Sequence, residues 1–228
     1  MLEDRPGLME AVRDRFAHVD TCPFQGGRIF LETAGGALTL KSVVETSATF
    51  AAIPDNQGRD NPASHALMEV IAKGKADMRL FLNASGGQVF VGESGTEVLF
   101  RLIRTACMGA PQGRVLGSTL EHPASRSAAS KWAAAAGKEY VCLPHDDATG
   151  CVTVEHYRPH ITPDTVVATI IHTSPVTGMG VDVGAIAAAI REVSPDCFII
   201  IDGIQHAAHG GLDIDSYGID GYALSPYK

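Results

Sequence analysis

The chain has 228 residues, of which 45% are apolar and 19% are charged, so it is long and apolar enough to build a buried core in one large domain or at most two small ones. This composition excludes a disordered tail and a coiled coil. The 18 basic and 26 acidic side chains give a formal net charge of −8, which argues against binding to nucleic acid or to an anionic membrane surface. No apolar run reaches the roughly 20 residues of a membrane-spanning helix, and the N-terminus has no signal-peptide apolar block.

Residues 1–27 begin with a segment of mixed charge at helical spacing, which predicts an N-terminal helical arm ahead of a larger domain. The five cysteines are scattered, odd in number and without Cys-x-x-Cys spacing. Such usage is typical of a reducing compartment and not of a disulfide framework, so we expect a cytoplasmic protein.

The first half of the larger domain alternates strand-like and helical patterns. Apolar β-type residues predict strands at Arg28–Leu31, ahead of a Gly35-Gly36 turn, and at Gln88–Val91. Apolar residues at helical spacing predict an amphipathic helix at His65–Asn83, and a second helix is expected over residues 94–107.

The second half repeats this alternation more regularly. The predicted helices are Ser125–Ala136 and Val183–Val193. The predicted strands are Arg114–Leu116, Tyr140–Leu143, Val166–Ile171, Cys197–Ile201 and Ile219–Ala223. Continuous apolar runs at 166–171 and 197–201 are typical of strands that are buried on both faces. The alternation as a whole predicts an α/β fold in which helices flank a mostly parallel sheet.

Functional residues in such sheets gather at the carboxyl ends of the strands. Polar residues occupy those positions at Glu93–Glu97, Glu121-His122, His172–Ser174 and Asp202. Gly95-Thr96 opens a helix whose N–H groups and hydroxyl suit a phosphate, although the same residues are typical of an ordinary helix cap. An acid at the end of a buried strand needs a cationic or hydrogen-bonding partner, although Asp-Gly is also a common turn.

The residues taken singly leave other interpretations open. His122 precedes a helix and suits a cap, and a terminal lysine such as Lys228 is usually a solvated charge. A zinc or iron site is an alternative at His206 and His209, with Asp202, Asp213 and Asp215 nearby. A nucleotide-binding module could use Gly95-Thr96, but no GxGxxG or Walker lysine motif follows a strand.

Five motifs follow one another along the chain: Gly-Thr-Glu at 95–97, Glu-His at 121–122, Ile-His-Thr-Ser-Pro-Val-Thr-Gly at 171–178, Ile-Asp-Gly-Ile-Gln-His at 201–206 and Ser-Pro-Tyr-Lys at 225–228. In this order and spacing they resemble the class V aminotransferase group of pyridoxal-phosphate (PLP) enzymes, which includes cysteine desulfurases, selenocysteine lyases and kynureninases. The resemblance covers most of the chain from about Arg28 to Lys228. It implies the large domain of a fold-type-I PLP-dependent transferase.

The resemblance implies catalytic roles for Lys228 and His122. Lys228 would form a Schiff base with pyridoxal 5′-phosphate, and its released amine would move the α-proton of the substrate. His122 would stack on the cofactor ring. Asp202 would pair with the pyridine nitrogen and Gln205 with the ring 3′ oxygen. The phosphate would be bound by Gly95, Thr96, Ser225 and Tyr227, and the substrate would lie near Thr173 and Ser174.

In the family that this chain resembles, the polypeptide continues beyond the lysine. Residues 28–228 are therefore expected to be an incomplete PLP-binding large domain, with the C-terminal small domain outside this chain. The resemblance also implies an amino-acid substrate and a homodimer. From the charge balance and the residue spacing, we expect no nucleic acid, membrane or metal as partner.

The most favoured function is a cysteine desulfurase-like carbon–sulfur lyase. Transamination or epimerisation by a class V aminotransferase is the alternative, since Pro175 and Tyr227 stand where desulfurases commonly carry asparagine and histidine. An inactive fragment with a binding role is the non-enzymatic alternative.

Overall fold

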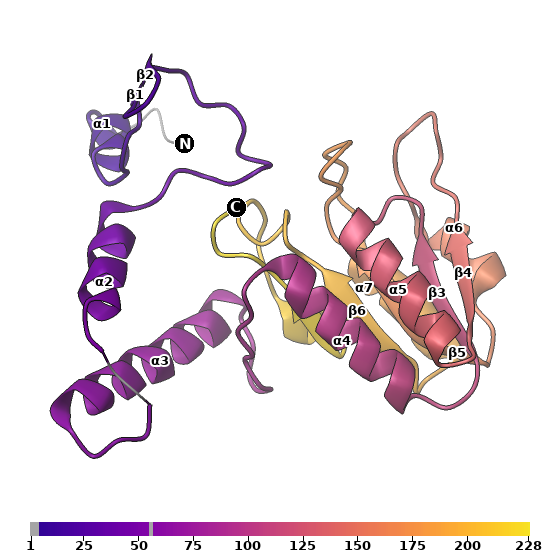
Figure 1. The fold of residues 1–228 in the computed structure, drawn as a ribbon. Helices are drawn as coiled ribbons and strands as arrows, with labels where there is room; N and C mark the ends of the chain where they lie inside the picture. Colours follow the sequence, from indigo (N-terminus) through magenta and orange to yellow (C-terminus); the bar gives the residue numbers. More distant parts are fainter. Residues whose placement is uncertain (1–4, 55–56) are drawn as a thin grey trace. The chain divides into compact units, whose positions relative to one another are not determined.

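The computed structural model describes residues 5–54 and 57–228, which divide into two units (Figure 1). The first unit contains the residues up to Asp77 together with Tyr227–Lys228, and the second contains Met78–Pro226. Within the described ranges, no helix is long and apolar enough to cross a membrane.

The first unit consists of helices and one very short hairpin. Its elements are α1 (Leu8–Arg13), β1 (Thr21–Cys22) paired antiparallel with β2 (Gly26–Gly27), α2 (Lys41–Ala51) and α3 (Pro62–Phe81), whose last residues belong to the second unit. The helix predicted at His65–Asn83 is confirmed as α3. Helix α2 was not predicted, because its valine, threonine and serine residues have low helix propensity.

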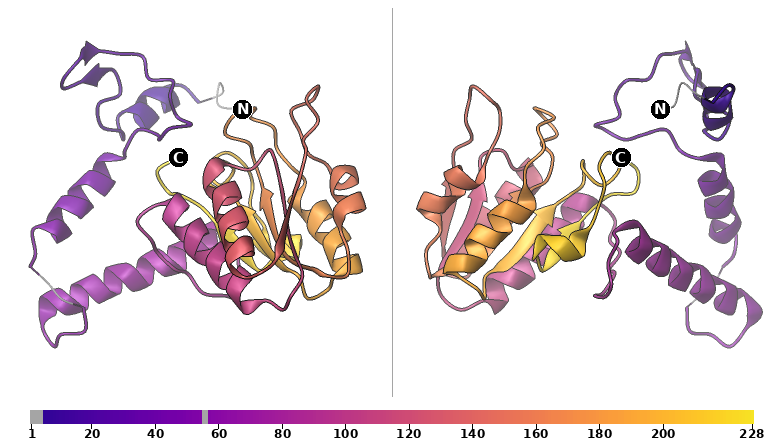
Figure 2. Two further views of the ribbon diagram at one scale, coloured as in Figure 1. Left: turned by 45° about the vertical axis from the view of Figure 1, so that its right-hand side comes forward. Right: turned by 180° about the vertical axis from the view of Figure 1, so that it is seen from behind.

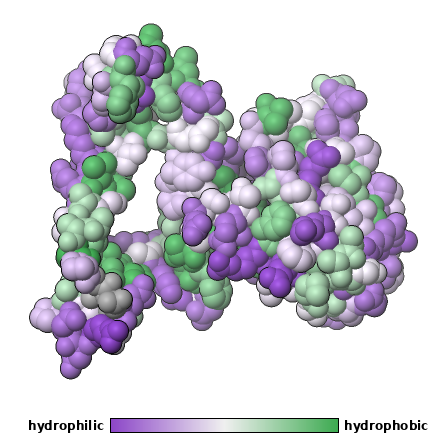
Figure 3. Space-filling model, viewed as in Figure 1, coloured by the Kyte–Doolittle hydropathy of each residue, from purple (hydrophilic) through white to green (hydrophobic). Residues whose placement is uncertain are grey.

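The helices of the first unit bury very little. Neither α1 nor α2 has a buried residue, and in α3 the buried residue is Ser64. Apolar side chains on these helices, including Met9, Val43 and Val70, are therefore exposed. Figure 3 shows apolar side chains on the surface along these helices.

Two predicted strands are wrong. Arg28–Leu31 and Gln88–Val91 join no ladder in the part of the chain that the structure describes. Their apolar side chains stay in solvent, with Ile29 89% exposed and Phe90 80% exposed. The β-type residues in these segments favour strands, but a strand forms only where a neighbouring strand accepts and donates its hydrogen bonds. The predicted turn at Gly35-Gly36 is confirmed.

The second unit contains a five-stranded sheet in the order β4-β3-β5-β6-β7. Its strands are β3 (Arg114–Ser118), β4 (Glu139–Leu143), β5 (Thr165–Ile171), β6 (Phe198–Asp202) and β7 (Gly221–Ala223). Every pair in this sheet is parallel, so the predicted α/β fold is confirmed and all five predicted strands from residue 114 onward are present.

Helices cover both faces of the sheet (Figure 2). One face carries α4 (Gly95–Gly109) and α5 (Pro123–Ala135), and the other carries α7 (Val183–Val193) with the short α6 (Val154–Tyr157). The 3₁₀ helices are Arg158–His160 and Ile214–Tyr217. Because strand side chains alternate, Ile200 packs in the core under α4 and α5, whereas Ile199 and Ile201 pack in the core under α7.

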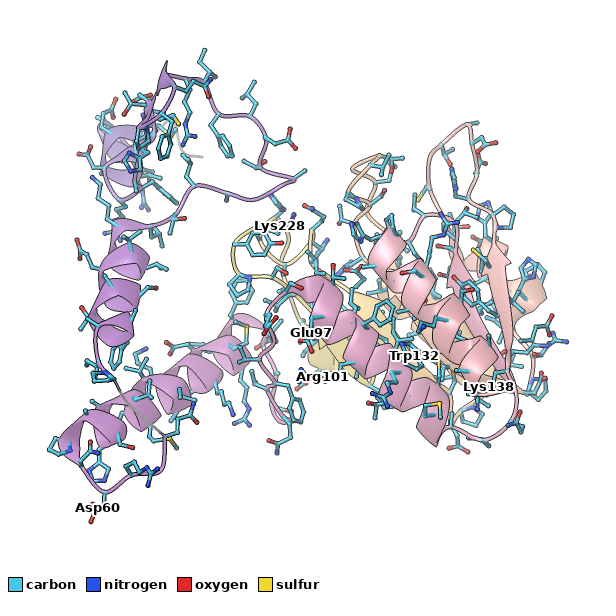
Figure 4. All side chains as sticks on the ribbon, viewed as in Figure 1. Asp60, Glu97, Arg101, Trp132, Lys138 and Lys228 are labelled. Atoms are coloured by element: carbon cyan, nitrogen blue, oxygen red, sulfur yellow. The ribbon has the colours of Figure 1, made fainter. Side chains whose placement is uncertain are left out.

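The pair of helices on the first face also contact each other through aromatic side chains. The Trp132 ring on α5 meets the Phe100 ring on α4 edge-on, with ring centroids 6.1 Å apart. Arg104 lies over the indole at 5.1 Å, and Figure 4 shows Trp132 directed toward α4. This packing fixes α4 and α5 as one layer and therefore fixes the positions of their N-terminal turns.

The order in which strands are added to the sheet changes side once, although all the strands are parallel. The chain crosses from β3 to β4 on one side and then places β5 on the other side of β3. In open parallel sheets, ligands bind beyond the carboxyl ends of the strands at such a switch point. The ladder between β3 and β5 runs from Arg114 to Leu116, so it ends before β5 does at Ile171.

Candidate functional site

The N-terminal turn of α4 lies against the ends of β6 and β7. Ser94 is the N-cap, and its hydroxyl accepts a hydrogen bond from the Glu97 amide at 3.1 Å, so the cap interpretation is confirmed. Glu97 in turn forms an ion pair with Arg101 one turn later (Figure 4). The helix therefore begins at Gly95, where the first N–H groups of a helix point outward and the macrodipole favours an anion.

Gly95 allows this turn to approach the following strands closely. A Cβ at this position would lie 2.7 Å from Ser225 Oγ and closer still to the Ile204 side chain. Gly95 and Ser225 are both buried, and they come from two different motifs. Thr96 follows at an exposed position on the same turn. The structure thus brings Gly95 and Ser225 together at a helix N-terminus, which is a geometry that suits a phosphate.

Asp202 ends β6 and is 4% exposed. Its Oδ1 accepts a hydrogen bond from the Ile204 amide at 3.2 Å, which is the turn contact expected of Asp-Gly. Its Oδ2 is buried and has no hydrogen-bond partner within the described residues. Burial raises the pKa of this carboxyl to about 6. A buried carboxylate oxygen without a donor is costly, so this atom can accept a hydrogen bond from a further cationic or polar group.

His122 is the N-cap of α5. Its Nδ1 accepts a hydrogen bond from the Ala124 amide at 3.1 Å, and Pro123 occupies the first helical position. The neutral ring then carries its proton on Nε2. The cap contact fixes the ring at the carboxyl end of β3, so the structural role and a role in ligand binding are compatible at this residue.

The loop after β5 is held by a pair of stacked imidazoles. The rings of His172 and His206 lie 3.4 Å apart and are inclined by 13°. His172 Nδ1 is 2.9 Å from the hydroxyl of Tyr222, and His206 Nδ1 is 2.9 Å from that of Thr173. Burial, followed by the neighbouring His206, lowers the pKa of His172 to about 4, so its ring is neutral near pH 7.

Thr173 and Ser174 thus belong to an ordered turn. The Ser174 hydroxyl oxygen accepts hydrogen bonds from the amides of Val176 and Thr177, each at 3.2 Å. The stacked pair was missed in the sequence, where His172 and His206 belonged to separate motifs. The register that pairs β5 with β6 is what brings them together.

The residues of the alternative metal site have other contacts in the structure. His206 faces Thr173 and His172, whereas His209 Nδ1 lies 2.7 Å from the carbonyl oxygen of Gln205. Asp213 and Asp215 bind Asn83 and the Ser85 amide. Across residues 5–54 and 57–228, no three His, Cys, Asp or Glu side chains are grouped in a way that could hold a metal ion.

Glu121 is a buried acid that the sequence marked only as part of the Glu-His motif. It is 3% exposed and accepts hydrogen bonds from the Ile171 amide at 2.8 Å and from the Ser125 hydroxyl at 3.0 Å. Burial and, next, the charge of Asp202 raise its pKa to about 8. No local pattern predicts the contact with Ile171, because Ile171 is fifty residues away.

The last two predicted residues belong to the first unit. The Tyr227 carbonyl accepts a hydrogen bond from the Ala37 amide at 2.7 Å, and the Lys228 ammonium donates one to the Ala34 carbonyl. The Tyr227 ring lies against Gly36, whose φ of +157° and close contact leave little room for a side chain. In sequence, Lys228 stands three residues after Ser225.

Comparison with known proteins identifies the family. The aminotransferase class-V family matches residues 29–228, which is most of the chain. The chain belongs to the aminotransferase class-V family. Enzymes of this family typically use PLP and bind amino-acid substrates.

Among curated proteins, the chain is 27% identical to the cysteine desulfurase-like protein ustD of Aspergillus flavus over 96% of this chain and 50% of that protein. It is 26% identical to the nonribosomal peptide synthetase-like enzyme fsqF of Aspergillus fumigatus, over 87% of this chain and 14% of that enzyme. The chain thus spans at most about half the length of these two relatives.

Solved structures support the fold. The cysteine desulfurase CsdA of Escherichia coli superposes with a TM-score of 0.77 at 21% identity, covering 96% of this chain and 54% of CsdA. An aspartate aminotransferase of Thermus thermophilus superposes with a TM-score of 0.63 at 21% identity, covering 79% of this chain and 49% of that enzyme. At these identities the likeness shows the shared fold-type-I architecture, as the sequence predicted.

Proposed function

We propose that this chain forms the large domain of a PLP-dependent enzyme that acts on an amino acid, with a cysteine desulfurase-like carbon–sulfur lyase as the preferred activity. The observation that carries the proposal is the buried, unpartnered Oδ2 of Asp202. The protonated pyridine nitrogen of PLP is the kind of donor that this oxygen needs. When bound, the cofactor supplies an electron sink for the carbanion that forms at the α-carbon of the substrate.

The charge of Asp202 fits this role. Its pKa of about 6 leaves the carboxyl ionised near pH 7, so it can keep a pyridine nitrogen protonated through an ion pair in a nearly dry environment. Gln205, three residues further along the same loop, is proposed to contact the ring 3′ oxygen.

The α4 turn fits the other end of the cofactor. Helix N-termini bind phosphate through N–H groups and the dipole, and Gly95 allows the Ile204 and Ser225 side chains to pack against this turn. Ser225 brings a hydroxyl to the same turn. We assign the phosphate to Gly95, Thr96 and Ser225, with Tyr227 as an additional donor.

The remaining roles follow from the chemistry of the side chains. Lys228 is proposed to hold the cofactor covalently and to move the α-proton of the substrate with its amine. His122, fixed by its cap contact, is proposed to cover one face of the cofactor ring. Thr173 and Ser174, held in an ordered turn, are proposed to contact the substrate.

The choice of reaction rests on the relatives. A desulfurase-like protein matches nearly the whole chain, and a cysteine desulfurase shares its fold. Transamination or epimerisation is the alternative, because an aspartate aminotransferase has the same architecture and Pro175 has no N–H to offer a substrate carboxylate. An inactive fragment with a binding role is the remaining alternative. An assay of the products separates the three functions. Sulfide release from L-cysteine supports the lyase, keto-acid formation supports transamination, and the absence of both products supports the inactive fragment.

The remaining parts of the proposal concern the whole protein. Residues 1–27 are proposed as an N-terminal arm and residues 28–228 as part of a large domain that is completed by a C-terminal small domain. We also propose a homodimer, because the helices of the first unit expose apolar side chains that a second copy could cover. A cytoplasmic location is proposed from the scattered free cysteines.

A PLP titration of the full-length protein tests the cofactor proposal. Wild-type protein is expected to bind PLP and to gain visible absorbance. Asp202→Ala is expected to weaken binding by on the order of 100-fold, since it removes one partner of a buried ion pair. Asp147→Ala is the matched control, because this aspartate is fully exposed. A protein that stays colourless, or an Asp202→Ala variant that binds like wild type, contradicts the proposal.

A further inference from the structure

Glu121 lies in the turn between β3 and α5, directly before His122. Turns at strand ends usually expose their acidic residues, but this side chain is 3% exposed. Its Oε1 accepts the Ile171 amide at 2.8 Å, and Ser118 Oγ lies 3.4 Å from the same oxygen. Its Oε2 is 3.0 Å from Ser125 Oγ on α5. The carboxyl group therefore connects β3, α5 and β5.

The contact with Ile171 replaces a missing strand contact. The β3–β5 ladder extends as far as Leu116 paired with Ala168, three residues before Ile171. The buried Ile171 amide lies beyond that ladder and would lose its partner without an acceptor. An unsatisfied buried amide is costly. The Glu121 carboxyl supplies the acceptor and so links the turn after β3 to the end of β5.

The other side of the turn is held as well. The Thr119 amide donates to the Leu143 carbonyl at 2.8 Å, and the Thr119 hydroxyl bonds the His145 amide and ring. The turn that ends in His122 is thus held to β4 through Thr119 and to β5 through Glu121. Loss of the Glu121 contact leaves the turn attached on the β4 side.

The same contact reaches Asp202 through the sheet. Ile171 pairs with Asp202 in the β5–β6 register, and the His172 amide donates to the Asp202 carbonyl at 2.9 Å. The titratable and charged groups around Glu121 are Asp202 on β6, Tyr140 on β4, Tyr157 on α6 and, near Tyr140, Arg126 on α5. Two buried carboxyls in one region do not both carry a charge without cost.

We propose that Glu121 is a positioning residue which, as an uncharged carboxylic acid, holds the His122 turn to β5 and leaves Asp202 as the charged carboxyl of the site. This inference deepens the proposed function and rests on it for the role of His122. The order of ionisation agrees with it, since the pKa of Asp202 is about 6 and that of Glu121 is about 8. The neutral acid accepts the Ile171 amide with one oxygen and bonds Ser125 with the other.

Glutamine reproduces both contacts without a charge, so Glu121→Gln is the conservative variant and Glu121→Ala removes the tether. We expect Glu121→Gln to bind PLP within about twofold of wild type, and Glu121→Ala to bind about tenfold more weakly. In a His122→Ala background, Glu121→Ala should cost less than about twofold, because its effect passes through His122. Additive losses in the double variant, or a glutamine variant as weak as alanine, would overturn the proposal.

The uncharged state has a test that needs no cofactor. A buried acid with a raised pKa binds its proton more tightly when folded, so stability is lost as pH rises from the ordinary carboxyl pKa to about 8. In this window the unfolding constant of the cofactor-free wild type should rise about tenfold per pH unit relative to Glu121→Gln. The control variant Glu192→Gln changes an exposed residue on α7, and its unfolding constant should depend on pH as that of the wild type does. Parallel curves for wild type and Glu121→Gln would show a charged Glu121 and overturn the proposal.

Imidazole NMR of the cofactor-free protein separates the two proposals. The His122 ring signal should shift or broaden in Glu121→Ala and stay at the wild-type position in Glu121→Gln. If no variant binds PLP, the proposed function fails, but this signal still decides whether Glu121 holds the turn. An unchanged His122 signal in Glu121→Ala would overturn the tether.

Discussion

The two units of this chain differ in where their stability can come from. In the second unit, strands with buried faces and helices with apolar faces form two cores, one on each side of the sheet. In the described part of the first unit, Ser64 is the buried residue, and α1 and α2 bury none. Local sequence patterns favour helices in both units. In the second unit, packing also holds side chains from different elements within hydrogen-bond distance of one another. The residues proposed to bind the cofactor ring and phosphate come mainly from that unit.

The largest contrast is expected from core truncation. Ile200 on β6 is fully buried, and Ile200→Ala should lower the free energy of unfolding by about 2–5 kcal/mol through lost burial and a cavity. Val44→Ala on α2, where the valine is 48% exposed, should change it by less than about 0.5 kcal/mol. Urea unfolding measures both. Equal losses would mean that the first unit has a core comparable to that of the second.

The buried charge of Asp202 provides the next contrast. Burial raises its folded pKa above the unfolded value, so its proton is held more tightly in the folded state and stability falls as pH rises from about 4 to about 6. Cofactor-free Asp202→Asn should lack this loss and gain about 3 kcal/mol over wild type near pH 7. The exposed Asp147→Asn should follow wild type at each pH. An Asp202→Asn variant with an unchanged pH profile of stability would show that Asp202 is not buried as described.

Two glycines of α4 sharpen the comparison within one helix. Gly95→Ala places a Cβ against Ile204 and Ser225 and should destabilise the protein by about 1–3 kcal/mol through overpacking, with weaker PLP binding. Gly109→Ala at the other end of the helix meets open space and should be neutral or stabilising by up to about 1 kcal/mol. Thermal unfolding and PLP titration compare the two. Similar outcomes would contradict the close approach of the α4 turn to Ser225.

The sequence predicted the elements that carry their own pattern. The helix beginning after Ser94, the exact limits of Val183–Val193 and the buried strands near 166–171 and 197–201 all depend on local spacing and capping. The errors occur where a partner decides the outcome. Gln88–Val91 has strand composition but no ladder among the described residues.

The site divides in the same way. The sequence motifs predicted which residues belong to the site, and they placed Asp202 at the end of a buried strand. The unpartnered oxygen of Asp202, the contact between Gly95 and Ser225 and the link from Glu121 to Ile171 could not, because each depends on strand order and on residues far apart in sequence. Burial and hydrogen bonding at these positions are properties of the assembled sheet.

The most direct test of the central claim is to locate the cofactor on the protein. Full-length protein is incubated with PLP, the adduct is fixed by borohydride reduction, and the modified lysine is identified by mass spectrometry of its peptides. The account predicts that the cofactor is attached to Lys228 and that Asp202→Ala lowers the yield at this lysine. Attachment to another lysine, such as the exposed Lys131, or no attachment in the wild-type protein, would contradict it.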